Sequence, residues 1–434
     1  MADPASSPSP SPSRSPNTPR GFATRAIQAA HRVPPVAQTP TSVPIYQTVT
    51  FTAADAAELG AVANRQVPGY AYGRLDNPTV VAFASAVAEL EDAEAGFGFA
   101  SGMGAIHAAL GTVVSAGERI LATHTSYGTT RAQLLTVFGR LGVRVDFVDV
   151  TDLGAIEAAL AAAPTRVLYA ETITNPTIVV TDHAALAELA HRFGALYVVD
   201  NTFATPYLCR PIELGADLVC ESATKYLAGH SDVMAGVVVG SRALVDRVRE
   251  FQVDTGATLD PHAAFLALRG LSTLALRMDR HSATASALAA WLEHQRAVRR
   301  VWHPSLPSHP QHDVAARQLA SGGGVFAFEV NGGRAAGEAL INALTLPART
   351  ASLGSVYTIV THPPSTTHRQ LDDAELEAAG ITPGLLRCSV GLEDLDDLVA
   401  DFERALAAAG EVARRVDGGR DDPDDSREAS RPEP

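Results

Sequence analysis

Short runs of β-branched and aliphatic residues alternate with longer Ala- and Leu-rich stretches from Gly96 to Val239. The apolar runs predict seven strands, at Gly96–Ala100, Arg119–Ala122, Arg144–Val148, Arg166–Ala170, Leu196–Asp200, Asp217–Cys220 and Ala235–Val239. Helical stretches lie between many of them, at Gly104–Ser115, Thr130–Leu141, Leu153–Ala162 and His183–Phe193. This alternation predicts an α/β domain with a mainly parallel sheet covered by helices on both faces. Ligands of such sheets bind at the carboxyl ends of the strands.

The pattern changes from Pro261 onward. The predicted elements are then a long helical region at Pro261–Glu293, a strand at Val325–Val330, a helix at Arg334–Ala343, a Gly/Ser/Thr/His-rich stretch at Ser352–His368, a strand at Leu386–Val390 and a closing helix at Leu395–Ala409. Because strands and helices no longer alternate regularly, we expect a second, smaller α+β domain.

These patterns divide the chain into five parts. Residues 1–20 are a Pro/Ser-rich tail and residues 413–434 an acidic tail, and both are expected to be disordered. Residues 21–75 hold few clear elements and are predicted to form an arm. The large domain is expected at 76–260 and the smaller one at 261–412.

Composition and charge exclude several classes of function. The chain of 434 residues is 46% hydrophobic and 19% charged, as in ordinary globular proteins. A net charge of −14 argues against nucleic acid as a partner. No apolar run is long enough to cross a bilayer, and the N-terminus lacks the apolar region of a secretory signal. Three scattered cysteines indicate a reducing compartment and no metal site, so we expect a cytoplasmic protein without a membrane partner.

Lys225 is the only lysine of the chain, beside 33 arginines, since lysine and arginine together number 34. A bias towards arginine explains the loss of lysines wherever a fixed positive charge is enough. A guanidinium stays protonated in proteins, whereas a lysine amine can lose its proton and become a nucleophile. Chance retention is the alternative, but the surrounding residues, Ser222-Ala223-Thr224-Lys225-Tyr226, favour a chemical role.

Two other segments carry candidate chemistry. Asp200 ends a predicted strand, where it either caps the next turn or pairs with a pyridinium nitrogen and so makes that ring an electron sink. Ser101-Gly102-Met103-Gly104 follows a strand and opens a helix, whose free amides form an anion site. Ser222 and Thr224 either add hydroxyl groups to the same anion or cap locally.

Five segments together resemble the Cys/Met-metabolism family of pyridoxal-phosphate (PLP) enzymes. They are Tyr72-Gly73-Arg74-Leu75-Asp76-Asn77-Pro78-Thr79, Ser101-Gly102-Met103, Val199-Asp200-Asn201-Thr202, Ser222-Ala223-Thr224-Lys225-Tyr226 and Arg387-Cys388-Ser389-Val390-Gly391-Leu392-Glu393. The family includes cystathionine γ-synthase, cystathionine lyases, methionine γ-lyase and O-acylhomoserine sulfhydrylases. The resemblance implies the fold-type I (aspartate-aminotransferase-like) architecture, with a seven-stranded sheet in the PLP-binding domain. It also implies a homotetramer of two tight dimers.

The resemblance also implies a role for each candidate residue. Lys225 would form a Schiff base with PLP and move protons, Asp200 and Thr202 would lie at the ring, and Tyr127 would stack on it. Gly102, Met103, Ser222 and Thr224 would hold the phosphate, joined by Tyr72 and Arg74 from the neighbouring subunit. Asn175 would lie near the phenolic oxygen of the ring, and Arg387 would bind the substrate carboxylate beside Ser352, with Asn175 and Tyr72 also at the substrate.

Simpler interpretations exist for single residues. Tyr127 could be a core aromatic, Arg387 part of a surface ion pair and Asn175 a turn residue before proline. A catalytically degenerate PLP-fold binding protein would have lost Lys225, Asp200 or Arg387, and all three are present. A plain aminotransferase would not be expected to carry the segment with Tyr72 and Arg74.

The resemblance implies γ-replacement or γ-elimination, with Tyr127 and Tyr72 as candidate acid/base groups. Thr129 stands where methionine γ-lyases usually carry cysteine, which counts against that lyase. Tyr357 stands where cystathionine-handling members often carry glutamate. The stretch Thr361–His368 is more similar to sulfhydrylases and some bacterial synthases. We therefore expect γ-replacement on an O-acylhomoserine, giving homocysteine or cystathionine, with a γ-eliminating cystathionine or methionine lyase as the alternative.

Overall fold

The computed structural model describes residues 39–366, 376 and 380–418. The chain divides into a short unit that ends at Val43 and a second unit from Pro44 onward. The second unit holds both sheets. The predicted terminal tails fall largely outside the described residues, as does part of the stretch after Thr366.

The large sheet has seven strands in the order β1-β7-β6-β5-β4-β2-β3. They are β1 (Ala95–Phe99), β2 (Arg119–Thr123), β3 (Arg144–Val148), β4 (Val167–Glu171), β5 (Leu196–Asp200), β6 (Leu218–Glu221) and β7 (Gly236–Gly240). The strands are parallel except β7, which runs antiparallel to both β1 and β6. The predicted mainly parallel seven-stranded sheet is confirmed.

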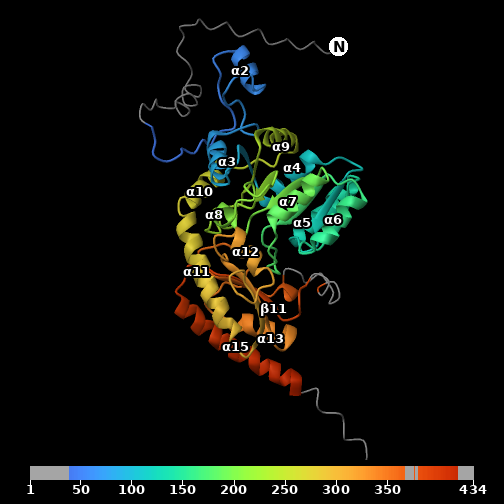
Figure 1. Cartoon of the computed structure of the whole chain (residues 1–434). Helices are drawn as coiled ribbons and strands as arrows, with labels where there is room; N and C mark the ends of the chain where they lie inside the picture. Colours follow the sequence, from blue (N-terminus) through green and yellow to red (C-terminus); the bar gives the residue numbers. More distant parts are fainter. Residues whose placement is uncertain (1–38, 367–375, 377–379, 419–434) are drawn as a thin grey trace, which may run out of the picture. The chain divides into compact units, whose positions relative to one another are not determined.

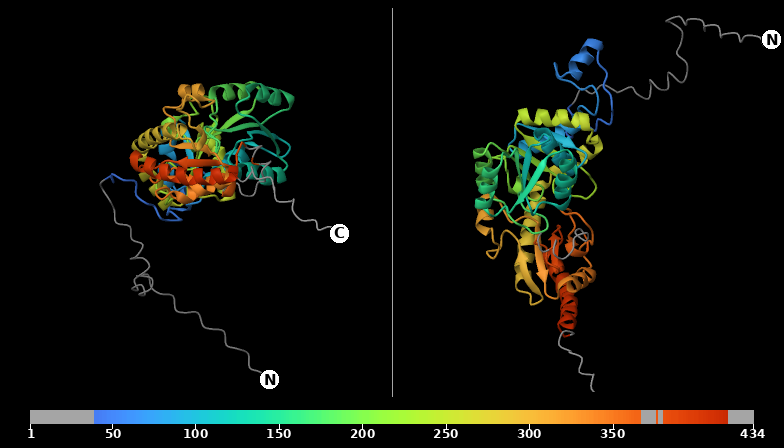
Figure 2. Two further views of the ribbon diagram at one scale, coloured as in Figure 1. Left: turned by 90° about the horizontal axis from the view of Figure 1, so that it is seen from below. Right: turned by 90° about the vertical axis from the view of Figure 1, so that its right-hand side faces the viewer.

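Helices cover both faces of this sheet (Figures 1 and 2). Tyr197 and Val199 of β5 belong to one buried cluster and Val198 belongs to another, as the alternation along a strand requires. The helices that contribute to the first cluster include α3 (Pro78–Leu90), α6 (Leu153–Ala162) and α7 (His183–Arg192). Those of the second are α4 (Gly102–Val113), the π-helical segment η1 (Gln133–Phe138) and α9 (Arg242–Thr255).

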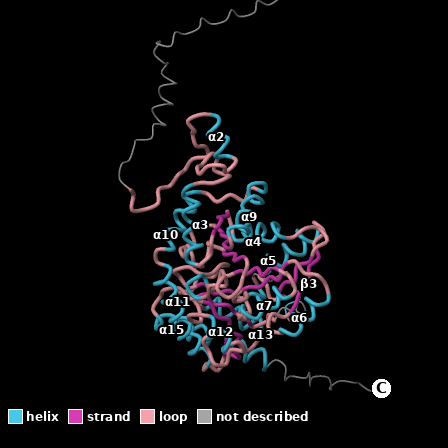
Figure 3. Tube along the Cα trace, turned by 45° about the horizontal axis from the view of Figure 1, so that its top comes forward, coloured by secondary structure: helices cyan, strands magenta, loops and turns pink. Residues whose placement is uncertain are grey.

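The smaller domain is an antiparallel sheet with helices packed on it. Its strands, in the order β10-β11-β9-β8, are β8 (Val298–Trp302), β9 (Val325–Val330), β10 (Ile359–Thr361) and β11 (Leu385–Ser389). The helices packed on it are the second half of α11 (Leu274–Glu293), α13 (Gly333–Ala343) and α15 (Leu395–Gly418), with a short 3-10 turn, η2 (Pro363–Ser365). The short helix α12 (His312–Gln318) contributes Ala315 to the first cluster of the large sheet instead. Phe326, Phe328 and Phe402 lie at its buried centre. Figure 3 shows strands in the interior and helices around them.

Several boundaries differ from the sequence prediction. The helical region at Pro261–Glu293 is two helices, α10 (Pro261–Leu271) and α11 (Leu274–Glu293). The predicted helix at Thr130–Leu141 consists of the end of α5 (Gly128–Ala132) followed by η1. The closing helix α15 continues to Gly418, so the tail predicted from residue 413 begins inside it. Strands β8 and β10 and helices α2 (Ala56–Ala63), α3, α8 (Thr205–Leu208), α9 and α12 were not predicted.

No helix within the described ranges is both long and apolar enough to span a membrane.

Arg277 of α11 ties the second long helix to the turn that follows Lys225. Its guanidinium donates to the carbonyl oxygens of Tyr226 (2.6 Å), Leu227 (3.2 Å) and Gly270 (2.8 Å). Gly270 packs directly on this turn, since a Cβ there would lie 2.4 Å from the carbonyl oxygen of Ala228. The side chain of Arg277 therefore supplies the donor for the buried carbonyl oxygens of Tyr226 and Leu227, whereas the carbonyl oxygen of Gly270 also accepts the amide of Thr273 at 3.1 Å.

We expect Arg277→Met to lower the free energy of unfolding by about 3 kcal/mol, because the buried carbonyl groups of Tyr226 and Leu227 lose their donor. Denaturation in urea measures this. Arg280→Met is the matched control on the same helix, since Arg280 is 45% exposed and pairs with Asp394. Its loss should cost less than about 1 kcal/mol. Equal effects of the two substitutions would contradict the structural role of Arg277.

Candidate active site

A cavity of about 270 Å³ lies at the carboxyl ends of the strands of the large sheet. Segments that follow β1, β2, β4, β5 and β6 line it, as the parallel arrangement requires. Nine predicted site residues line this cavity: Gly102, Met103, Tyr127, Asn175, Asp200, Thr202, Ser222, Thr224 and Lys225. The structure therefore brings together residues that are spread over more than a hundred positions of the chain.

The surroundings of Lys225 favour the neutral form of its amine. Burial, together with the nearby charge of Arg387, lowers the pKa of Lys225 to about 8. The Nζ atom donates to Ser352 Oγ at 2.7 Å. Thr224, the preceding residue, exchanges hydrogen bonds with the backbone of Ala235, at 3.0 and 3.2 Å. This contact fixes the turn that presents the lysine, so the Thr224 hydroxyl is already engaged by the protein.

Arg387 of β11 is 4% exposed and pairs with no carboxylate among the described residues. Its guanidinium donates to Asn175 Oδ1 (2.8 Å) and to the carbonyl oxygen of Ser352 (2.5 Å). Its buried Nε has no partner within the described chain. Burial lowers the pKa of Arg387 to about 10, so the group stays positive at neutral pH. A buried cation with an unused donor is suited to bind a carboxylate.

Ser352 adopts a backbone conformation that is unfavourable for a residue with a side chain. Its φ is +103°, in the region that favours glycine. Such conformations cost on the order of 1–3 kcal/mol and persist only where surrounding contacts impose them. Here Arg387 holds the carbonyl oxygen and Lys225 contacts the hydroxyl. Ser352 thus links the amine to the buried guanidinium.

Asp200 and Glu171 form the acidic side of the cavity. They end adjacent parallel strands and are register partners. Burial raises the pKa of Asp200, although its hydrogen bonds with Thr202 oppose the shift. Burial, followed by the charge of Asp200, raises the pKa of Glu171 well above the usual range. A protonated pyridine nitrogen placed at Asp200 would relieve this accumulation of negative charge.

Glu171 was missed from the sequence. Its carboxylate accepts the backbone amide of Tyr127, and the amide of Asn175 also hydrogen bonds to it. One buried carboxyl therefore holds two segments that carry predicted site residues. The available signal was an acid at the end of a buried strand, four positions before Asn175.

The first turn of α4 fits a phosphate group. Ser101 Oγ accepts the amide of Gly104 at 3.1 Å, while the helix itself offers no acceptor to the amides of Gly102 and Met103. A Cβ on Gly102 would lie 2.6 Å from Ser222 Cβ, so only glycine lets the helix approach Ser222 so closely. Amide donors and a serine hydroxyl at a helix N-terminus suit the phosphate of PLP.

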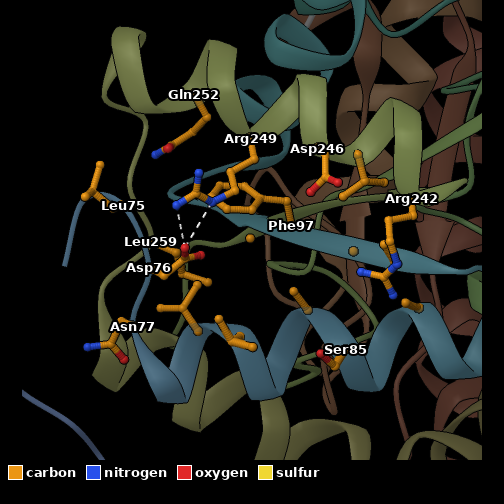
Figure 4. Close-up of a pocket in the computed structure, with 18 of the residues that line it drawn as sticks. Leu75, Asp76, Asn77, Ser85, Phe97, Arg242, Asp246, Arg249, Gln252 and Leu259 are labelled. Carbon is orange, nitrogen blue, oxygen red and sulfur yellow. Dashed lines mark hydrogen bonds and ion pairs between the residues drawn. The ribbon is translucent and has the colours of Figure 1, made fainter. Parts of the chain in front are cut away.

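Tyr72 and Arg74 do not line the cavity around Lys225. The Arg74 guanidinium donates to the carbonyl oxygen of Val253, and its carbon lies 5.8 Å from the centre of the Tyr72 ring. Arg74 instead lines a separate cavity of about 520 Å³, where Arg249 pairs with Asp76 at 2.5 Å (Figure 4). Within one chain these two residues are thus separate from the lysine site.

Thr129 and Tyr357 are both exposed side chains outside the lining of the cavity. No group of His, Cys, Asp or Glu in the described part of the chain is arranged to hold a metal ion.

Comparison with known proteins agrees with this geometry. The model of the family described as Cys/Met metabolism PLP-dependent enzyme matches residues 23–407. The chain is 47% identical over 392 residues to an L-methionine gamma-lyase of Pseudomonas putida, an alignment that covers 90% of this chain and 98% of that protein. It is 42% identical over 387 residues to an O-succinylhomoserine sulfhydrylase of Pseudomonas aeruginosa, with 89% and 95% covered.

A solved structure shows the same fold. The crystal structure of cystathionine gamma synthase from Xanthomonas oryzae pv. oryzae, in complex with aminoacrylate and cysteine, superposes with a TM-score of 0.83. It is 35% identical in sequence, and the match covers 91% of this chain and 100% of that one. The resemblance and the fold-type I architecture are confirmed, and this chain belongs to the Cys/Met metabolism family of PLP-dependent enzymes.

Proposed function

We propose that this enzyme catalyses γ-elimination from methionine or a similar thioether amino acid, releasing a thiol, 2-oxobutyrate and ammonia. The observation that carries the proposal is the apolar lining of the cavity. Six of its side chains are apolar: Met103, Ile106, Ile173, Phe203, Met234 and Leu353. A thioether methyl group suits such surroundings, because its transfer from water is favourable.

The same lining has few charged side chains that could bind a charged leaving group. Of the described residues that line the cavity, the charged ones are Lys225, Asp200 and Glu171. Lys225 and Asp200 are engaged with the cofactor in this proposal, and Glu171 accepts backbone amides. Among the described residues of one chain, no further cation lines the cavity to bind a succinyl carboxylate, and the exposed Tyr357 supplies no carboxylate for the distal ammonium of cystathionine.

The comparisons support elimination over the γ-replacement favoured by the sequence motifs. A second methionine gamma-lyase, from Pseudomonas deceptionensis, is 45% identical over 399 residues. Thr129, in the position where methionine γ-lyases usually carry cysteine, is exposed and does not line the cavity, so it does not exclude elimination. γ-Replacement on O-succinylhomoserine is the second candidate, since the sulfhydrylase relative is 42% identical.

The residues around Lys225 can perform the proton transfers that elimination requires. Bound PLP supplies an electron sink for the electrons that remain when a proton leaves the substrate. Arg387 would hold the substrate carboxylate through its Nε donor, which hydrogen bonds to no residue in the described ranges. The amine of Lys225, with its pKa of about 8, can take and return a proton near neutral pH. Tyr127, which is 41% exposed, would deliver a proton to the departing sulfur.

We also propose that the enzyme is a homotetramer in which Tyr72 and Arg74 complete the site of a neighbouring subunit. The arm exposes seven large apolar side chains, namely Ile45, Tyr46, Val49, Leu59, Val67, Tyr70 and Tyr72. Helix α2, made of apolar residues apart from one glutamate, buries none of its side chains. Apolar surface of this kind is typical of a protein interface.

A panel of substrates tests the reaction. We expect methionine alone to yield 2-oxobutyrate and methanethiol, while O-succinylhomoserine with sulfide yields homocysteine at less than about one-tenth of that rate. Chromatography of products from the PLP-loaded enzyme measures both, with cystathionine as a further substrate. Efficient thiol addition to the ester, with little turnover of methionine, would establish γ-replacement instead.

The pKa of Lys225 predicts how the rate at which the apoenzyme takes up PLP depends on pH. The amine attacks PLP only when neutral, and its lowered pKa makes the neutral form available at lower pH. The rate of PLP uptake by the apoenzyme should therefore rise roughly tenfold per pH unit up to about pH 8 and then level off. Visible absorbance of the bound cofactor reports this rate.

Substitutions identify the groups responsible. Arg387→Gln should move the midpoint to higher pH, because a nearby cation no longer opposes protonation. Lys225→Arg should abolish the absorbance and turnover, and Arg299→Gln, at a 69% exposed side chain, should change neither. Normal turnover by Lys225→Arg would refute the assignment.

Mixed subunits test the shared site. Lys225→Arg and Arg74→Gln subunits are each expected to be inactive, yet a mixed dimer contains one site with both residues intact. An equal mixture should regain about a quarter of wild-type activity after exchange of subunits. A mixture of Lys225→Arg and Asp200→Asn should stay inactive, because both residues line the cavity of one chain. Failure of the first mixture, with hybrid dimers verified by tags, would place the whole site within one subunit.

A further inference from the structure

A chain of hydrogen bonds connects fully buried polar side chains beside the cofactor cavity. It includes Thr172 and Asn201, each flanked in sequence by residues that line the cavity. Tyr197 Oη lies 2.7 Å from His183 Nδ1, and His183 Nε2 lies 3.0 Å from Thr172 Oγ1. Thr172 Oγ1 donates to Asn201 Oδ1 at 2.7 Å, and Asn201 Nδ2 donates to Glu91 Oε1 at 2.7 Å. All five side chains are 0% exposed.

The donors of this chain all point towards Glu91. The Thr172 hydroxyl gives its proton to Asn201, so it must accept from His183 Nε2. Burial lowers the pKa of His183 to about 3, so the ring is neutral and its Nδ1 accepts from the Tyr197 hydroxyl. Each bond of such a one-way chain polarises the next, so the Asn201 amide becomes a stronger donor. Its acceptor is a carboxyl oxygen of Glu91.

Glu91 meets a second buried carboxyl group. Glu221, the last residue of β6, is 1% exposed, and its carboxyl group lies close enough to that of Glu91 for a hydrogen bond once a proton lies between them. Glu91 Oε2 and both oxygens of Glu221 have no donor from another group in the described chain. Two ionised carboxylates in this position would repel each other in surroundings that screen charge poorly. One proton between them supplies the missing donor and removes the repulsion.

We propose that Glu91 and Glu221 share one proton, and that this pair positions Asn201 and with it the end of β5 that carries Asp200. The side-chain amide of Asn201 accepts a hydrogen bond from Thr172 and donates to Glu91 and, at 2.9 Å, to the carbonyl oxygen of Cys209. The carboxyl pair therefore fixes one of the three contacts that hold this amide. Glu221 is joined directly to Ser222 and the turn of Lys225. The pair thus connects the two strand ends that present Asp200 and Lys225, whichever bond the enzyme cleaves.

The surrounding charges favour retention of the proton. Burial raises the pKa of both carboxyl groups, and the charge of Glu91 raises that of Glu221 further. Asp200 and Glu213 add negative charge, whereas Arg210 and the amide of Asn201 stabilise an anionic Glu91. Cys209 also faces Glu91, and burial raises the pKa of its thiol to about 12, so it stays neutral.

The sign of the pH dependence follows from the raised pKa. A raised folded-state pKa stabilises the protein fully below the unfolded value of about 4.3, and this contribution is lost as the pH rises through the folded-state pKa. Glu221→Gln replaces the shared proton by an amide hydrogen that is present at every pH. In this variant, the contribution of the contact between residues 91 and 221 to stability should therefore not decline in alkaline solution.

The test compares wild-type enzyme with Glu221→Gln and Glu91→Gln. We expect the infrared band of a protonated carboxyl group at pH 8 to weaken in both variants. The Tm of the wild-type apoenzyme should fall between pH 5 and 9 by at least about 2 °C more than that of Glu221→Gln. The Kd for PLP should rise at least about tenfold more in the wild type than in Glu221→Gln over pH 7–9, because only the wild-type pair becomes doubly charged.

Glu213→Gln is the matched control, since it removes an exposed carboxylate that also faces Glu91. It should keep the infrared band and the wild-type profiles of Tm and Kd. The proposal fails if the band is unchanged in both pair variants. A Tm effect without any change in the pH profile of PLP binding would reduce the pair to a structural contact and overturn its positioning role.

Discussion

The burial of ionisable groups at one edge of a parallel sheet is the constraint on which this active site depends. A charge removed from water is costly unless hydrogen bonds or an opposite charge replace the solvent. Lys225 meets this cost by a lowered pKa and a bond to Ser352, and Arg387 by bonds to Asn175 and Ser352. The strained backbone of Ser352 is stable because it serves both cations at once.

The acidic groups obey the same constraint in the opposite direction. Asp200 and Glu171 lie side by side at the ends of adjacent strands, where burial favours their neutral forms. Backbone amides hold Glu171, and Thr202 holds Asp200. A cationic ring therefore belongs in this cavity for electrostatic reasons, in addition to the shape of its phosphate site. Beside these charged groups the lining offers polar hydroxyl and amide groups and six apolar side chains, a combination that suits a thioether substrate better than a charged leaving group.

Local signals predicted much of this arrangement. The strands alternate with helices at regular spacing, and Lys225 stands out in an arginine-rich chain, so the sheet and the lysine could be recognised from nearby residues. Glu171 could not be assigned, because its role depends on amides that fold back to it from Tyr127 and Asn175. The contact of Glu91 with Glu221 joins positions 130 apart, and no periodicity reports such a pairing.

The amine of Lys225 has a consequence for chemical modification of the protein. Among the side chains, a reagent selective for amines therefore has a single target, which substrate or cofactor should protect. A fluorescent or isotopic label at Lys225 would report on the cavity without competing signals from surface lysines.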